Sequence, residues 1–402
     1  MRIGNGFFKE NRRAFKDRLP EGTAVFMFAG EAPAVSADND ARFLPDRNFY
    51  YLTGLEDPCA RLIITKTEEY LFALKRDPLK ERWTGKRHSK EELESITGIV
   101  KENIFDLGDF DDRKYELLKE QKLTPAGDSG SIMKEAREFF RENDAEDVKD
   151  ILISMRMVKR EEEIESIREA CRMTEDSIED MVKVIKEGTT EVELYAAMEY
   201  AMMRRGSLIP AFTSITAIGE NVFCLHHEDP EGEEGPTVKE GSQIQLDVGA
   251  RCNGYCADIS RAIFIGKKQE NDRRYELLEL VDELRQTAWK TIRPGITMGD
   301  LNKEMRRICG VWLCAHNVLH EGYTDEDVKK YYWHNTGHHL GLDVHDVSLK
   351  DKPFEKGNCL AIEPGVYIEE WGTGFRIEDD VLVTDNGCEL LSSGKNVGEV
   401  LL

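Results

Sequence analysis

The sequence predicts an α+β protein of two domains, a mixed α/β domain over residues 1–152 and a larger α+β domain over residues 153–402. The chain has 402 residues, which exceeds the roughly 250–300 residues at which a single hydrophobic core stops growing. Apolar residues make up 40% and charged residues 33%, a composition that supports buried cores. A long helical pattern opens just after residues 150–158, and we place the domain boundary there.

In the first domain, helical and strand patterns alternate. Residues 5–19 carry apolar side chains at helical spacing until Pro20, which cannot continue a helix. A second helix is expected over residues 89–96, because Glu92 follows Ser89 at the spacing of a capping box. Short apolar runs predict strands, and these are residues 23–30, 60–65 and 69–74.

The second domain is predicted to combine helices with antiparallel strand pairs. Glycines end the helical patterns, and threonines cap two of them, as helix termini favour. The patterns cover residues 161–187, 190–206 and 271–293, and a fourth helix begins after Thr297. Short alternating stretches between and after these helices predict the strands.

The charge balance narrows the possible partners. Asp and Glu number 78 against 55 Lys and Arg, a formal charge of −23. Such a surface repels a phosphate backbone, so we expect no nucleic-acid partner. The sequence contains no apolar run of ~18 residues, and charges interrupt the stretch where a signal peptide would be apolar. The nine cysteines show no C-x-x-C spacing, which indicates reduced thiols. We therefore expect a cytoplasmic protein with no membrane partner.

Residues 243–265 predict a β-hairpin. The first half alternates apolar and polar residues, and Asp247 lies on the polar face. Asn253-Gly254 is the strongest short signal for a hairpin turn. If these two residues form the loop, Asp247 pairs with Ser260 on a second strand that continues to the end of the range.

In this register, Asp258 lies diagonally across from Asp247 on the same face, at roughly 7–8 Å between Cα atoms. Two carboxylates so placed can hold two divalent cations about 3.5–4 Å apart, and without cations they repel each other. The alternative is that one aspartate is a turn or edge residue and the pairing is coincidental. The hairpin by itself leaves both interpretations open.

Histidines and glutamates cluster elsewhere in the second domain. The histidine clusters are His226 and His227, and then His334, His338, His339 and His345. Packing alone does not explain four histidines within twelve positions, and the H-E-x-x-H spacing of a zincin is absent. Glu363 and Glu378 both lie in apolar strand patterns, where a carboxylate needs a partner. That partner can be a cation or Arg376, two residues before Glu378.

Taken in order, these residues resemble the pita-bread metallopeptidases, which include methionine aminopeptidase, aminopeptidase P and prolidase. The matching motifs are CLHH with His226, LDVG with Asp247, YCADISR with Asp258, the cluster with His338, IEPG with Glu363 and RIEDD with Glu378. The resemblance extends over about residues 155–402, and it implies a C-terminal pita-bread domain. RNFYYLTG and Trp83-Thr84-Gly85 resemble the N-terminal domain of aminopeptidase P and prolidase, which methionine aminopeptidases lack.

The resemblance implies two divalent metal ions. Their ligands in this sequence would be Asp247, Asp258, His338, Glu363 and Glu378. Four carboxylates balance two dications, and oxygen-rich ligands with one imidazole suit Mn²⁺ or Co²⁺, with Zn²⁺ as a further candidate. The ions would provide hydroxide near neutral pH for attack on a peptide carbonyl.

The resemblance also implies catalytic roles. Glu363 would take the proton from the attacking water, and Arg376 would orient a bridging carboxylate. His345 would contact the substrate carbonyl, and His334 would line the pocket for the residue after the cut.

One histidine assignment is open. The resemblance gives His226 the role of positioning substrate and moving protons. However, the sequence has four extra residues before Asp247, within EDPEGEE, so His227 is an alternative. This acidic stretch itself is expected to be a solvated loop.

Among the relatives, the resemblance favours an Xaa-Pro aminopeptidase, which removes the first residue of a peptide whose second residue is proline, and it implies a homodimer. An Xaa-Pro dipeptidase (prolidase) is the alternative within the enzyme class. A catalytically inactive binding module of the same fold is the alternative outside it, but such relatives have lost metal ligands that this sequence retains.

Overall fold

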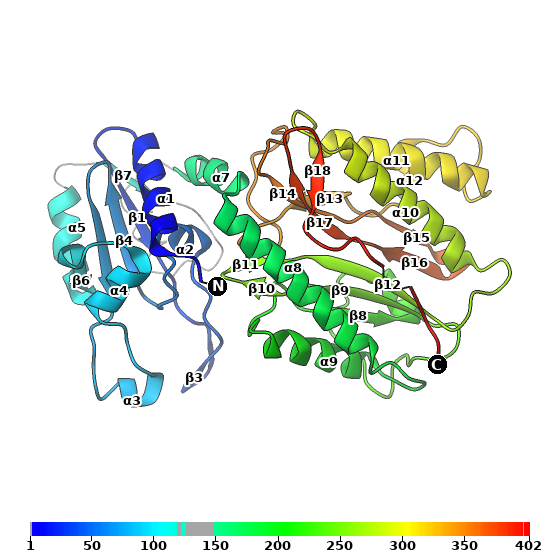
Figure 1. Ribbon diagram of the computed structural model, residues 1–402, viewed down its shortest axis with the longest axis horizontal. Helices are drawn as coiled ribbons and strands as arrows, with labels where there is room; N and C mark the ends of the chain where they lie inside the picture. The colour runs from blue at the N-terminus through cyan, green and yellow to red at the C-terminus, as the bar shows by residue number, and fades with distance from the viewer. Residues whose placement is uncertain (1, 119–121, 126–147, 397) are drawn as a thin grey trace. The chain divides into compact units, whose positions relative to one another are not determined.

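A computed structural model describes residues 2–118, 122–125, 148–396 and 398–402. The chain divides into two compact units, residues 1–155 and 156–402, which contain the blue-to-cyan and the green-to-red elements of Figure 1. None of the helices in the described ranges combines the length and the apolar character that a bilayer crossing requires.

The first unit is built on a five-stranded sheet in the order β6-β5-β4-β1-β7. β1 pairs antiparallel with β4 and parallel with β7. The strands are β1 (Thr23–Phe28), β4 (Arg61–Thr65), β5 (Glu69–Ala73), β6 (Ile104–Asp106) and β7 (Lys122–Pro125), with a small hairpin of β2 (Ala34–Ser36) and β3 (Asn39–Asp40). Phe26 and Phe72 meet the ring of Phe110 edge to face in the core of this unit.

The helices of the first unit are α1 (Asn5–Arg18), α2 (Arg47–Thr53), α3 (Glu81–Thr84), α4 (Lys90–Thr97) and α5 (Phe110–Leu118). The expected capping box is present, because Ser89 accepts from the backbone N–H of Glu92 and the Glu92 carboxylate accepts from that of Ser89. The aromatic RNFYYLTG stretch, for which no helix or strand was predicted, contains α2. The Asp46 side chain caps this helix by accepting a hydrogen bond from Phe49 N. The predicted mixed α/β character is confirmed.

The second unit contains two four-stranded sheets in the orders β19-β12-β9-β8 and β13-β14-β17-β18. The first comprises β8 (Ile215–Ile218), β9 (Gln243–Val248), β12 (Ile259–Ile265) and β19 (Gly398–Val400). The second comprises β13 (Gly337–His339), β14 (Cys359–Ile362), β17 (Asp379–Val383) and β18 (Cys388–Leu390). Two short ladders accompany them, β10 (Arg251–Cys252) with β11 (Tyr255–Cys256) and β15 (Gly365–Ile368) with β16 (Thr373–Arg376).

Helices cover these sheets, as the green and yellow coils of Figure 1 show. α8 and α9 pack against each other and against strands of the first sheet, whereas α10 packs against α11 and the β15–β16 pair. The helices of the second unit are α8 (Glu161–Val182), α9 (Glu191–Arg204), α10 (Arg273–Thr291), α11 (Met298–Ala315) and α12 (Asp325–Val328), whereas α7 (Lys149–Met157) includes the boundary between the units. α8 ends before the predicted residue 187 because its last turn tightens into i→i+3 bonds at Val184 and Ile185.

The predicted hairpin register is confirmed. Asp247 pairs with Ser260, and Cys252 pairs with Tyr255. Asn253 and Gly254 both have positive φ, 49° and 83°, as a type I′ turn requires. The second strand is not continuous, however, because it breaks between β11 and β12. Asp258 lies in this break, and its backbone N–H bonds a side chain instead of the ladder.

A buried carboxylate near this hairpin should make stability depend on pH. Glu163 on α8 accepts from Tyr255 OH and from Arg160 N, both at 2.9 Å, and burial raises its pKa to about 7 from 4.5. Between these pH values the folded protein holds more protons than the unfolded chain, so this group lowers stability as pH rises. Between pH 5 and pH 7, the free energy of unfolding should therefore fall by roughly 1–3 kcal/mol less in Glu163→Gln than in wild type, as measured by urea unfolding at the two pH values. The exposed neighbour Glu162 provides the control as Glu162→Gln, and equal slopes in all three proteins would contradict the assignment.

Candidate metal centre

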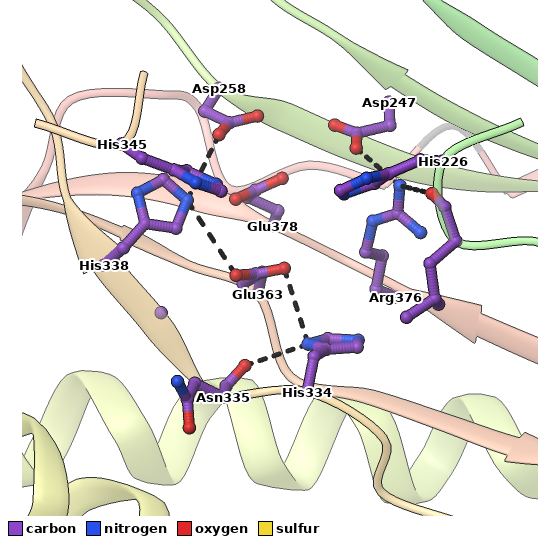
Figure 2. A pocket seen from close by; sticks show the side chains of 12 residues that line it. His226, Asp247, Asp258, His334, Asn335, His338, His345, Glu363, Arg376 and Glu378 are labelled. Carbon is purple, nitrogen blue, oxygen red and sulfur yellow. Dashed lines mark hydrogen bonds and ion pairs between the residues drawn. The ribbon is translucent and has the colours of Figure 1, made fainter. Parts of the chain in front are cut away.

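The nine side chains that the resemblance assigns to metal binding or catalysis line one cavity of about 280 Å³ in the second unit. They are His226, Asp247, Asp258, His334, His338, His345, Glu363, Arg376 and Glu378, and Leu225, Asn335 and Gly337 complete the lining. Figure 2 shows Asp247 and Asp258 on one side of Glu378 and Glu363 on the other. Residues more than a hundred positions apart in the sequence therefore share one site.

Strand ends and strand breaks present several of the acidic groups. Asp247 lies on β9 and His338 on β13, but Glu363 follows the end of β14 and Glu378 lies between β16 and β17. The expectation that both glutamates lie within strands is therefore wrong. Pro364 follows Glu363 and has no N–H to donate to a ladder, which accounts for the break beside it.

The ligand atoms of three residues lie close enough to bind one ion. Oxygen atoms of Asp258 and Glu378 and a ring nitrogen of His338 all lie within 4.8 Å of one another. His338 Nε2 is 3.3 Å from Asp258 Oδ2 and 3.8 Å from Glu363 Oε1. Glu363 therefore lies next to this group of three residues, beside His338.

Burial makes this concentration of negative charge costly. It raises the pKa values of Asp258 and Glu378 well above their usual range. Repulsion from Asp247 adds to both shifts, and repulsion from Asp258 adds to that of Glu378. Burial also raises the pKa of Glu363 to about 7, although the nearby His338 opposes the shift. Each group therefore lacks the compensation that an ionised carboxylate needs in a protein interior.

The donor set fits divalent cations. Asp247 Oδ1 and Glu378 Oε1 are buried without any hydrogen-bond partner among the described residues, and such atoms are rare unless something else satisfies them. Within the same ranges, no lysine or arginine forms an ion pair with Asp258, Glu363 or Glu378. No thiol lines the cavity, so the donors are carboxylate oxygens and imidazole nitrogens, which suit hard and borderline dications.

Arg376 and Ser260 hold two of the carboxylates in place. Arg376 Nη2 lies 2.5 Å from Asp247 Oδ2, and its Nε donates to Ser260 Oγ at 3.1 Å. Ser260 Oγ in turn donates to Glu378 Oε2 at 2.9 Å. The sequence analysis offered either a cation or Arg376 as the partner of Glu363 and Glu378. In the structure, Arg376 forms its ion pair with Asp247 instead.

Sequence reasoning missed two supporting groups, Ser260 and Asp380. Asp380 is fully buried, and its Oδ2 accepts from Asp258 N at 3.0 Å and from Cys171 Sγ at 3.2 Å. A signal for each was present, because Ser260 faces Asp247 in the predicted register and Asp380 follows Glu378 at the spacing of one strand face.

The histidines occupy different sides of the cavity. The rings of His338 and His345 lie 4.1 Å apart between centroids, and His334 Nε2 is 3.1 Å from Tyr367 OH. Burial lowers the pKa of His334 to about 4 and, more modestly, that of His345, so both rings are neutral at physiological pH. His226 lines the cavity, whereas His227 Nε2 contacts Glu191 Oε2 at 2.7 Å.

Comparison with known proteins assigns the class. The model of metallopeptidase family M24 matches residues 165–385, and that of the aminopeptidase P N-terminal domain matches residues 8–124. The chain therefore belongs to metallopeptidase family M24, and the resemblance to the pita-bread enzymes is confirmed.

Individual relatives are similar over nearly the whole chain. An Xaa-Pro aminopeptidase of Escherichia coli is 27% identical, and the match covers 96% of this chain and 94% of the relative. An Xaa-Pro dipeptidase of Pyrococcus furiosus is 30% identical, with 86% and 90% covered. The solved structure of Pseudomonas aeruginosa aminopeptidase PepP superposes with a TM-score of 0.88 at 27% identity, covering 98% of this chain and 96% of that one. These matches confirm the predicted fold class.

Removing one carboxylate tests the cation site. Wild-type protein dialysed against Mn²⁺ should retain about two ions per chain, and its melting temperature should rise with Mn²⁺ because binding stabilises the folded state. Asp258→Asn should retain less metal and show a smaller rise. Without metal, the variant should melt no lower than wild type, because one buried like charge is gone.

The matched control is Asp385→Asn, which alters an exposed aspartate paired with Lys356 and should leave metal content unchanged. Equal Mn²⁺ content in wild type and Asp258→Asn would contradict the site.

Proposed function

We propose that the protein is a metal-dependent Xaa-Pro aminopeptidase that hydrolyses the bond between the first residue of a peptide and a following proline. The observation that carries the proposal is the cavity that gathers four carboxylates and His338, with acidic oxygens left unpartnered. Two divalent ions, Mn²⁺ first among Mn²⁺, Co²⁺ and Zn²⁺, would be held by Asp247, Asp258, His338, Glu363 and Glu378.

Cations bound there would supply hydroxide near neutral pH and polarise the scissile carbonyl. Glu363 would take the proton from the attacking water, since its carboxylate lies between His334 Nδ1 at 3.5 Å and His338 Nε2 at 3.8 Å. Arg376 would hold the Asp247 carboxylate in its orientation, because their ion pair is almost fully buried.

The histidines would bind substrate and stabilise developing charge. His345 would donate to the substrate carbonyl, and His334, whose ring is fixed by Tyr367 OH, would line the pocket for proline. His226 would position the peptide and move protons, and the contact between His227 and Glu191 supports assigning this role to His226. The neutral rings of His334 and His345 suit this work, since each can donate from one nitrogen and accept at the other.

The alternative activity is that of an Xaa-Pro dipeptidase. A relative with that name is 30% identical, so the choice rests on other features. The aminopeptidase P N-terminal domain match over residues 8–124 favours the aminopeptidase. We further propose a cytoplasmic homodimer. The nine cysteines without C-x-x-C spacing are in keeping with the reducing environment of the cytoplasm.

Peptide length separates the two activities. With Mn²⁺, the protein should release the first residue from an Xaa-Pro-Xaa tripeptide, as followed by chromatography of the products. His226→Ala should lower kcat on the same peptide by roughly 100-fold or more, as loss of a proton-transfer group does, while leaving bound Mn²⁺ unchanged.

Cleavage of Xaa-Pro dipeptides without any cleavage of tripeptides would replace the proposal with the dipeptidase. Binding of peptide without hydrolysis under any metal would favour the inactive binding module.

A further inference from the structure

The adjacent histidines His226 and His227 serve different partners. His226 lines the cavity, and His227 Nε2 lies 2.7 Å from Glu191 Oε2. The same carboxylate oxygen accepts from Glu231 N at 2.9 Å, and the contact with His227 fits a ring N–H at Nε2 as a second donor to it. Because the two residues share a peptide bond, anchoring one side chain constrains the direction of the other.

Glu191 is an unusually well-satisfied carboxylate. It is the first residue of α9 and is 0% exposed. Its Oε1 accepts from Ile218 N at 2.7 Å and from Asn221 Nδ2 at 3.0 Å. Its Oε2 accepts from His227 and, at 2.9 Å, from Glu231 N. Four donors converging on one buried group hold it in a single position, and each loses its partner if the carboxylate is removed.

Both neighbours of His226 are therefore tied down. On one side, Leu225 O accepts from Arg376 Nη2 at 3.2 Å, and the same guanidinium binds Asp247. On the other side, His227 is held by Glu191. Each anchor lies one Cα step of about 3.8 Å from His226, so the backbone position from which the His226 ring reaches the cavity is held on both sides.

The same carboxylate also fixes the acidic stretch that follows. Glu231 N donates to Glu191, and Val192 N donates to Glu231 O at 3.3 Å. Asn221 Nδ2 reaches Glu231 Oε1 at 3.4 Å. The acidic residues of the stretch 228–234, Glu231 included, are exposed, as expected of a solvated loop, but the backbone of Glu231 is anchored to the start of α9.

We propose that Glu191 is a positioning residue for catalysis. Through His227 and Glu231 it fixes the segment 224–231, and thereby sets where the His226 ring stands relative to a bound peptide. The inference rests on the proposed function, because His226 is the group through which Glu191 acts. A misplacement of about 1 Å at such a ring can cost roughly 100-fold in rate.

The test is a double-mutant cycle on Xaa-Pro-Xaa tripeptide hydrolysis with Mn²⁺. Glu191→Gln places an amide NH₂ where backbone and ring donors already point, so kcat should fall roughly 10- to 100-fold, with bound Mn²⁺ close to wild type. The melting temperature should also fall, because buried donors lose their acceptor, so the double-mutant cycle and not the melting temperature tests the positioning role. His227→Gln should also lower kcat. In a His226→Ala background, Glu191→Gln should change kcat by less than about 2-fold, because the group it positions is absent.

The matched control is Glu193→Gln in the same helical turn, where the carboxylate binds only Thr190. This variant should keep wild-type kcat. If the losses from Glu191→Gln and His226→Ala simply multiply, Glu191 has a general structural role and the proposal is overturned.

Hydrogen exchange separates this proposal from the proposed function. The amides of residues 224–231 should exchange faster in Glu191→Gln than in wild type or Glu193→Gln, whichever peptide the protein cleaves. If exchange is faster in the variant but the protein lacks Xaa-Pro activity, the proposal that Glu191 fixes the segment 224–231 stands, and only the proposed activity is refuted. Unchanged exchange across residues 224–231 would overturn the proposal that Glu191 fixes this segment.

Discussion

The mutual repulsion of buried carboxylates is the constraint on which the rest of the second unit depends. Asp247, Asp258, Glu363 and Glu378 converge on one cavity, and burial together with the charge of their neighbours opposes the ionisation of Asp258 and Glu378. A fold does not keep such a cluster for stability, since apolar residues in the same places would cost less. Bound dications remove the penalty, which makes the arrangement reasonable only as a metal centre.

The protein surrounds this cluster with groups that fix it in advance. Buried arginines lie behind it: Arg261 donates to the carbonyls of Ser260 and Glu378, and both Arg261 and Arg285 pair with Asp379. These bonds join β12 to the segment that carries Glu378. Close backbone approach does the same for the hairpin, because a Cβ on Gly249 would meet Ala257 O at 2.0 Å. Positions of ligands are therefore set by the scaffold, as preorganised sites require.

Sequence patterns predicted the hairpin because local chemistry determines it, whereas the resemblance to the pita-bread enzymes supplied the groups around the cavity. Asn253-Gly254 set the turn, the turn set the register, and the register placed Asp247 opposite Ser260. The strand breaks at Asp258, Glu363 and Glu378 were not predicted, since the apolar alternation continues through them. Adjacent residues on an irregular segment carry no periodicity, so only the contact with Glu191 distinguishes His227 from His226. Long-range partners of this kind arise from packing and leave no local pattern.

The central claim is that paired cations neutralise this acidic cavity. A crystal grown with Mn²⁺ and measured at the manganese absorption edge tests it most directly. We predict two anomalous peaks about 3.5–4 Å apart, in contact with oxygens of Asp247, Asp258, Glu363 and Glu378 and with His338 Nε2. A map without anomalous density in the cavity, with the carboxylates still gathered as they are in Figure 2, would contradict the account.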